Sequence, residues 1–392
     1  MRFARGRLTA AATAAVAAAG LAATAVPAHA EPAHADAGHR GTLLASAPLH
    51  TAAALPSASF TRAIRYVSEG VGGKRIAVTG TVAVPKGKAP RGGWPVISWA
   101  HGTTGTADAC APSRDTATGP AHDYLSITEG YLDKWVAHGF AVVQTDYEGM
   151  GTPGGHPYMN GASEANTVID IVRAAHGVDP HIGRTFYVAG HSQGGHATLF
   201  TAAEKTRDVR LKGAVSIAPG SHMAETATYV QARYPGAELA LPFLFVLLNG
   251  AEAANPSFHP EKLLTDRAAA VLASGRTTAC LAQLREAGSS IPLDQVFRPD
   301  ADLTAFETYF NTQEATGLDL RVPTLVAQGT ADTSVSPAAT KALVADLCKR
   351  SPAIAYREYA GADHRAAIGA SFDDALAFVQ TLQSGGTPPT TC

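Results

Sequence analysis

A short motif flanked by glycines is the strongest chemical signal in this sequence. It reads Gly190-His191-Ser192-Gln193-Gly194 and fits the pattern G-x-S-x-G. The motif follows an apolar run at 185–189 and opens a segment with helical character. In that setting a serine sits on a strained bend between strand and helix, and the flanking glycines leave room for backbone and substrate. We therefore predict that Ser192 is a nucleophile.

A serine hydroxyl is a poor nucleophile at neutral pH and needs a base, which in turn needs an acid to orient it. Two later residues follow short apolar runs typical of strands: Asp332 first and then His364. The order serine, acid, histidine is the one that accompanies this motif. We predict that His364 is the general base and that Asp332 orients it.

Other roles are open for these two residues. Asp332 could cap the helix expected to start near Pro337, and His364 could be an ordinary surface histidine. Asp363 could be the acid, but a side chain adjacent to His364 cannot easily reach the same imidazole ring.

The developing oxyanion of an acyl-transfer reaction needs preorganised N–H donors. One donor is expected to be the backbone N–H of Gln193, directly after the nucleophile. The second should come from the loop 101–105, where Thr103 is our choice and Thr104 the alternative. A glycine-rich turn without a catalytic role is the other interpretation of this loop.

The sequence lacks the residue patterns that a metal site or a phosphate-binding loop requires. His191 and His196 flank the serine, but they should point in different directions, and the cysteine spacing matches no zinc site. The glycine-rich stretch 147–158 has no lysine in P-loop register. We expect no metal and no cofactor.

The elements around these residues predict an α/β fold with a mostly parallel, doubly wound sheet. Residues 62–67 and 75–85 alternate apolar and polar side chains and are expected to form an antiparallel hairpin at its edge. Nearly continuous apolar runs typical of strands buried on both faces lie at 95–99, 140–143, 185–189, 213–217 and 323–327. Helices are expected at 163–175, 192–205, 337–349 and 372–382.

Residues 222–320 interrupt this alternation and are too many for a structureless loop. They contain an apolar run at 239–248 and Ala-rich stretches near 263–272 and 279–287. We predict a mainly helical cap, or lid, inserted into a core made of 57–221 and 321–392. The run 239–248 is expected to be a buried cap helix, a wall facing the substrate, or both.

The N-terminus predicts export. Arg2, Arg5 and Arg7 precede an Ala-rich run that ends at 28–30 in a small-residue triplet, as in a signal peptide covering 1–30. A similar triplet at 33–35 leaves the cleavage site open. Residues 31–56 are expected to form a flexible arm, and no later segment is expected to span a membrane. The mature protein should be secreted.

Charge and cysteine content agree with export and argue against nucleic acid as a partner. Without the three signal-peptide arginines, 28 basic residues face 33 acidic ones, a net charge of about −5. Four cysteines in an oxidising compartment favour two disulfides, with all three pairings open; unpaired buried cysteines are the alternative. They are Cys110, Cys280, Cys348 and Cys392.

The motifs together resemble a known family. The segments 98–105, 147–151 and 190–195, with the acid and histidine loops, are similar to the secretory lipase family of α/β-hydrolases, which includes fungal lipase A. They are also similar to secreted actinobacterial esterases, among them feruloyl esterases. The resemblance covers the chain from about residue 60 and includes a cap of similar size.

The resemblance implies an α/β-hydrolase fold, the triad Ser192, Asp332 and His364, and an oxyanion hole in the first loop and at Gln193. It also implies two disulfides, Cys110–Cys280 from core to cap and Cys348–Cys392 at the tail. One departure is that the fungal members carry an aspartate where this chain has Thr103 or Thr104.

These observations predict a carboxylic ester hydrolase, a lipase or esterase acting on a small-molecule or lipid ester, with feruloyl esters included. The alternative is peptide cleavage at a chain end, or acyl transfer to another alcohol, with the same triad. A secreted binding module without activity would be expected to lack a triad member, and all three are present.

Overall fold

The structure is a computed structural model that describes Met1, residues 38–351 and residues 353–392. The predicted signal peptide after Met1 and the first part of the predicted arm lie outside the described residues.

A single nine-stranded sheet organises the fold, in the order β1-β2-β3-β5-β4-β6-β7-β8-β9. The strands from β5 to β9 in this order are all parallel, and the hairpin of β2 and β3 joins them antiparallel through β3 and β5. The predicted α/β-hydrolase fold is thereby confirmed. The strands are β1 Leu43–Pro48, β2 Ala58–Glu69, β3 Arg75–Pro85, β4 Trp94–Ala100, β5 Ala141–Thr145, β6 Ile182–His191, β7 Arg210–Ile217, β8 Thr324–Gly329 and β9 Ile354–Tyr359.

The predicted flexible arm is wrong for its second half. Residues 43–48 form β1, which pairs antiparallel with β2 at the edge of the sheet. Leu49 and Leu55 are buried just beyond it, and the Leu55 N–H donates to the Thr61 hydroxyl at 3.1 Å. The pairing with β2 stabilises this short strand, so its position in the sheet depends on the neighbouring strand more than on its own sequence pattern.

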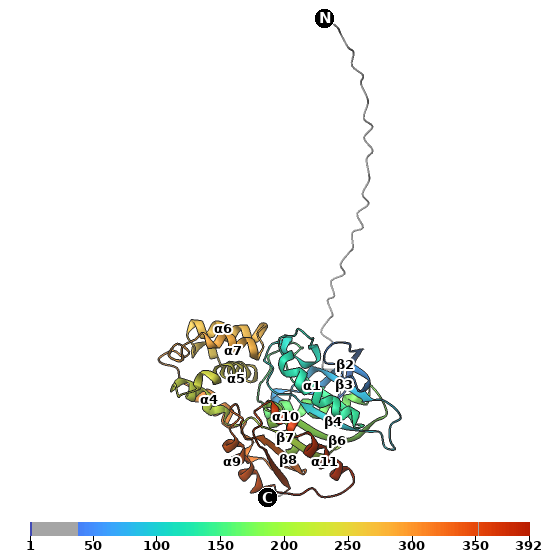
Figure 1. The fold of residues 1–392 in the computed structure, drawn as a ribbon. Helices are drawn as coiled ribbons and strands as arrows, with labels where there is room; N and C mark the ends of the chain where they lie inside the picture. Colours follow the sequence, from blue (N-terminus) through green and yellow to red (C-terminus); the bar gives the residue numbers. More distant parts are fainter. Residues whose placement is uncertain (2–37, 352) are drawn as a thin grey trace. The chain divides into compact units, whose positions relative to one another are not determined.

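Helices cover both faces of the sheet (Figure 1). Adjacent strand residues point to opposite faces, so Val96 packs with α2 and α3 whereas Ile97 packs with α1 and α11. The helix α9 lies on the α3 side, through Leu343 and Leu199. The core helices are α1 His122–Ala137, α2 Gly161–Ala175, α3 Gln193–Ala203, α9 Pro337–Cys348, α10 Ala366–Ala370 and α11 Phe372–Gln383.

The helix α1 is absent from the sequence-based expectations. Its buried residues, among them Leu125, Leu132 and Trp135, do recur with helical spacing. Gly130 and the intervening charged residues dilute this pattern, and packing against the sheet overrides the weak propensity.

Between β7 and β8 the chain forms five α-helices with a hydrophobic core of their own. Figure 1 shows α4, α5, α6 and α7 gathered beside one another, with α5 in contact with α4, α6, α7 and α8. Their bounds are α4 Met223–Gln231, α5 Leu241–Ala254, α6 Asp266–Thr277, α7 Leu281–Ser289 and α8 Thr304–Asn311. This is the mainly helical insertion that the fold class predicts.

One stretch of the described chain, Ala237–Ala254, is long and apolar enough to cross a membrane by length and composition, with a mean hydropathy of 1.4. It includes Glu238 and Glu252, and 61% of it is buried. Most of its apolar residues belong to the buried core of the helical insertion, so packing accounts for most of its hydropathy, although Leu239 is exposed.

Two disulfides, Cys110–Cys280 and Cys348–Cys392, join the cysteines that the resemblance pairs. Cys280 caps α7, and beside it the Leu281 N–H donates to the Thr104 carbonyl at 2.8 Å. Gly105 forms a β-bridge with Cys280. The first disulfide therefore fastens the loop after β4 to the helical insertion.

Replacing each disulfide pair with serines should have different local effects. The Cys110/Cys280 double variant should lose about 1 kcal/mol more stability than the Cys348/Cys392 variant, because 170 rather than 44 residues separate the joined positions. Thermal unfolding measures this difference. Amide hydrogen exchange should rise at residues 103–106 in the first variant only, and equal exchange there in both would contradict the assigned role.

Candidate active site

Ser192 occupies the sharp bend between β6 and α3. Its backbone has φ 59° and ψ −117°, a left-handed region that costs energy for any residue with a Cβ. A Cβ at Gly190 would collide with the Gly194 carbonyl, and one at Gly194 would collide with the Ala100 carbonyl at the end of β4. The two glycines of the motif are thus required by backbone contact, and the bend presents the Ser192 side chain at the carboxyl edge of the sheet.

The structure brings Asp332 and His364 together. Asp332 follows β8, His364 follows β9, and the Asp332 Oδ2 lies 2.8 Å from the His364 Nδ1. The other oxygen, Oδ1, accepts the backbone N–H groups of Ser334 and Val335, each at 2.8 Å. Burial acts to raise the pKa of Asp332, but the bond to His364 and these two N–H groups outweigh it and hold the pKa below its ordinary value. The carboxylate is therefore ionised at neutral pH.

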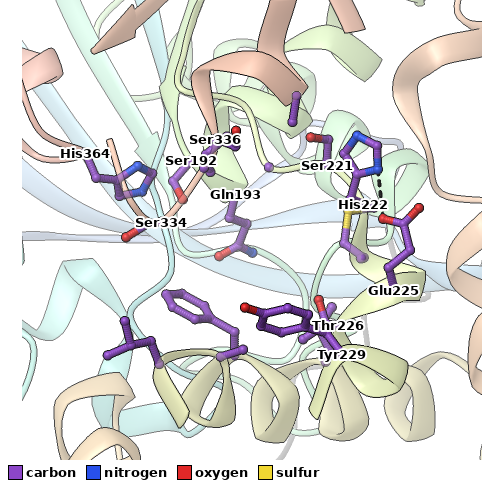
Figure 2. A pocket seen from close by; sticks show the side chains of 18 of the residues that line it. Ser192, Gln193, Ser221, His222, Glu225, Thr226, Tyr229, Ser334, Ser336 and His364 are labelled. Carbon is purple, nitrogen blue, oxygen red and sulfur yellow. Dashed lines mark ion pairs between the residues drawn. The ribbon is translucent and has the colours of Figure 1, made fainter. Parts of the chain in front are cut away.

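Ser192 and His364 line the same pocket, and Figure 2 shows the imidazole ring directed toward the Ser192 side chain. No hydrogen bond joins the Ser192 hydroxyl to the ring in this structure; such bonds are often long before a substrate binds. Because Nδ1 faces the carboxylate, Nε2 is the nitrogen free to take a proton.

The alternative acid, Asp363, is directed elsewhere. Its Oδ1 accepts the backbone N–H groups of Arg365 and Ala366 at 3.0 and 2.8 Å, where it stabilises the start of α10. It forms no hydrogen bond with the His364 ring.

The two expected oxyanion donors come from the residue after the nucleophile and from the loop after β4. Gln193 begins α3 and lines the pocket with Ser192. Thr103, in the buried loop after β4, does not line the pocket; its hydroxyl lies 2.7 Å from the hydroxyl of Tyr158, which does. Neither the Thr103 nor the Gln193 backbone N–H donates to another described protein group.

The Gln193 side chain is held by a buried polar network that the sequence analysis missed. Its Nε2 donates to Glu164 Oε1 at 2.7 Å and to His156 Nε2 at 2.9 Å. His156 Nδ1 in turn donates to the Glu148 carbonyl at 2.9 Å, which leaves Nε2 as the acceptor. Burial lowers the pKa of His156 to about 3, so the ring is neutral. The glycine-rich stretch 147–158 thus supports Gln193 rather than a phosphate.

The pocket has a volume of about 870 Å³ and runs between α9 and the helices α4 and α5. Met159, Tyr229, Phe243 and Leu247 supply apolar surface. Small side chains of the loop after β8 and of α9 line the opposite side, where Figure 2 labels Ser334 and Ser336. Among the lining residues, Glu225 is the one acid and Arg285 the one permanently charged base.

One group in the described residues has the geometry to hold a metal ion. The ligand atoms of Asp115, His122 and Glu129 lie within 4.8 Å of one another. None of the three lines the pocket with Ser192, and His122 Nδ1 already pairs with Asp115 at 2.6 Å.

A family described as serine aminopeptidase, S33, matches residues 121–367, a range that includes Ser192, Asp332 and His364. No curated protein matches the chain.

Several solved structures share the fold. Candida antarctica lipase A in its closed state has a TM-score of 0.75 and 19% identity, over 92% of this chain and 86% of that one. The ligand-bound cell wall degrading esterase LipA from Xanthomonas oryzae has a TM-score of 0.68 and 20% identity, over 89% of this chain and 100% of that one. A putative hydrolase from Legionella pneumophila has a TM-score of 0.70 and 19% identity, over 87% and 98%.

These identities support a shared fold, in agreement with the predicted resemblance, and the family match goes further. The chain belongs to the serine aminopeptidase S33 family of hydrolases, with the α/β-hydrolase fold.

Proposed function

We propose that this protein is a secreted serine carboxylic ester hydrolase that acts through Ser192, His364 and Asp332. The observation that carries the proposal is the 2.8 Å bond from the His364 ring to a buried, ionised Asp332, with the ring and Ser192 in one pocket. Three segments far apart in sequence supply these groups.

The reaction proceeds in two halves. Ser192 Oγ attacks the ester carbonyl while His364 Nε2 takes the hydroxyl proton, and the same proton then passes to the leaving alcohol as the C–O bond breaks. A water molecule next attacks the acyl-enzyme, His364 takes one of its protons, and that proton returns to Ser192 as the acid product leaves. Asp332 holds the tautomer and stabilises the imidazolium formed in each half.

The negative charge on the carbonyl oxygen would be met by the backbone N–H groups of Gln193 and Thr103. Both are free of other described partners, and the hydrogen bonds of the Gln193 side chain fix the start of α3. Preorganised donors of this kind contribute roughly 3–4 kcal/mol each to catalysis.

The pocket favours an ester with a sizeable apolar part, either an acyl chain or an aryl group. A volume of about 870 Å³ lies within the usual range for small-molecule sites, and Tyr229, Phe243 and Leu247 supply apolar walls. In this proposal residues 222–320 are the cap, and α5 serves as both a buried helix and a wall of the site. The two disulfides support export to an oxidising compartment.

Peptide cleavage at a free N-terminus is the second candidate, because the family description names an aminopeptidase. Glu225 could pair with an α-ammonium group in the pocket. Its Oε2 already lies 2.8 Å from His222 Nδ1, as the dashed line in Figure 2 marks, and its side chain is 69% exposed. The mostly apolar walls therefore favour the ester. Acyl transfer to an alcohol other than water would use the same acyl-enzyme.

Replacing Ser192→Ala should abolish hydrolysis of p-nitrophenyl esters and labelling by a fluorophosphonate probe, because no nucleophile remains. Ser221→Ala, which removes a hydroxyl from the same pocket, is the matched control and should keep both activities. Esterase activity retained by Ser192→Ala would defeat the proposal. Rates over acyl chain lengths, methyl ferulate and aminoacyl anilides then separate lipase, aryl esterase and peptidase.

Replacing Asp332→Asn should lower kcat by about 10³- to 10⁴-fold, because the amide favours the wrong imidazole tautomer. Asp363→Asn should stay within a few-fold of the wild-type rate. If the two variants lost activity equally, Asp332 would not be the orienting acid.

The stability difference between the wild type and Asp332→Asn should depend on pH. Folding lowers the pKa of Asp332, so its ionised carboxylate stabilises the fold above the ordinary pKa of 3.8, and this contribution disappears as pH falls through the lower folded-state pKa. The difference in thermal stability between the wild type and Asp332→Asn should therefore narrow when the pH is lowered from 7 to below 3.8. Thermal scans at both pH values measure it.

A further inference from the structure

A buried histidine and a buried tyrosine connect three loops that hold the proposed catalytic groups. His191 is the last residue of β6, directly before Ser192, and Tyr124 lies in the first turn of α1. Their exposed fractions are 1% and 8%, and neither lines the pocket. The reaction proposed above uses neither side chain.

Three hydrogen bonds form a continuous chain through these residues. His191 Nε2 lies 2.8 Å from the carbonyl oxygen of His364, and His191 Nδ1 lies 3.0 Å from the Tyr124 hydroxyl. The Gly102 backbone N–H donates to that hydroxyl at 2.9 Å. The chain thus runs from the loop after β4, through α1 and the end of β6, to the base itself.

The partners allow one arrangement of protons. A carbonyl oxygen can only accept, so His191 Nε2 must carry hydrogen and donate to it. In the neutral ring Nδ1 then accepts from the Tyr124 hydroxyl, whose oxygen accepts from Gly102. Burial, and after it the nearby His364, lower the pKa of His191 well below its ordinary value, in agreement with a neutral ring.

The groups around His191 explain why neutrality matters. The His364 ring lies 4.4 Å away between centroids, Tyr124 faces Nδ1 from α1, and Arg365 adds positive charge next to His364. A charged His191 would repel the imidazolium that forms on His364 in each half of the reaction. A neutral ring instead supports the His364 backbone without opposing its charge.

We propose that His191 and Tyr124 are positioning residues that hold the base and the oxyanion loop in register with the nucleophile. His191 fixes the His364 carbonyl, and Tyr124 fixes Gly102, whose neighbour Thr103 supplies the second proposed donor. This inference rests on the proposed function. Displacement of a reacting group by about 1 Å can cost on the order of 100-fold in rate, so a fixed backbone at both loops matters for chemistry more than for binding.

The first experiment compares Tyr124→Phe with Tyr131→Phe. Both tyrosines are buried in α1, but Tyr131 packs against Trp99 and Phe372 and lies in none of the catalytic loops. Tyr124→Phe should lower kcat for p-nitrophenyl ester hydrolysis by roughly 10- to 100-fold with KM within about twofold, because two loops lose their register. Tyr131→Phe should keep kcat near the wild-type value, with thermal unfolding reported for both.

The second experiment removes the two hydrogen bonds of the His191 ring one at a time. His191→Gln keeps a donor near the Nε2 position and so can still reach the His364 carbonyl, whereas His191→Asn keeps an acceptor near Nδ1 for Tyr124. His191→Gln should retain more kcat than His191→Asn, because kcat should depend more on the position of His364 than on the hydrogen bond to Tyr124. Adding Tyr124→Phe to His191→Gln should cost less than it does in the wild type, because one of the two hydrogen bonds that it removes, the one to His191, is already lost.

Two outcomes would overturn the positioning role: a kcat for Tyr124→Phe within threefold of Tyr131→Phe, or fully additive losses in the double variant. Labelling of the wild type by a fluorophosphonate separates this result from failure of the proposed function. Labelling at Ser192 that is equally fast in Tyr124→Phe rejects the positioning role alone. Absence of labelling in the wild type rejects the triad.

Discussion

The strained bend at Ser192 is the constraint on which the site depends. The backbone there is left-handed, and the Ser192 N–H donates to the Ile217 carbonyl of β7 at 2.9 Å, while Gly194 presses against the Ala100 carbonyl of β4. The bend is therefore in direct contact with the ends of β4 and β7, two central strands of the sheet. A local distortion of this cost persists only where the surrounding structure fixes it, and here the sheet does so.

The parallel sheet also explains why the other groups meet at this bend. The loop with Thr103 follows β4, Ser192 follows β6, Asp332 follows β8 and His364 follows β9. Apart from β7, which lies between β6 and β8, these strands are neighbours, and their carboxyl ends share one edge. The helical insertion leaves the sheet at the same edge, after β7, so the pocket forms where the bend, the acid loop and α5 face one another.

Two networks of hydrogen-bonded polar side chains are buried around the bend, although Gln193 Oε1 and His101 Nε2 are buried without a hydrogen-bond partner among the described residues. Glu164, His156 and Gln193 form one network at the start of α3, and His191 with Tyr124 forms another that reaches the His364 carbonyl. Unsatisfied buried groups are costly, whereas satisfied ones hold neighbouring segments in a single arrangement. The two networks therefore fix the backbone at the start of α3 and at His364, next to the proposed reaction centre.

The sequence by itself determined the features that local pattern encodes. Apolar runs gave β4 to β8, glycine spacing gave the bend at Ser192, and chain order gave Asp332 and His364 as its candidate partners. Only the tertiary structure decided that residues 43–48 join the sheet as β1, which cysteines pair, and that His191 reaches the carbonyl of His364, 173 positions away. The physical reason is that these features depend on contacts between distant segments, and such contacts leave no periodic signal in either segment alone.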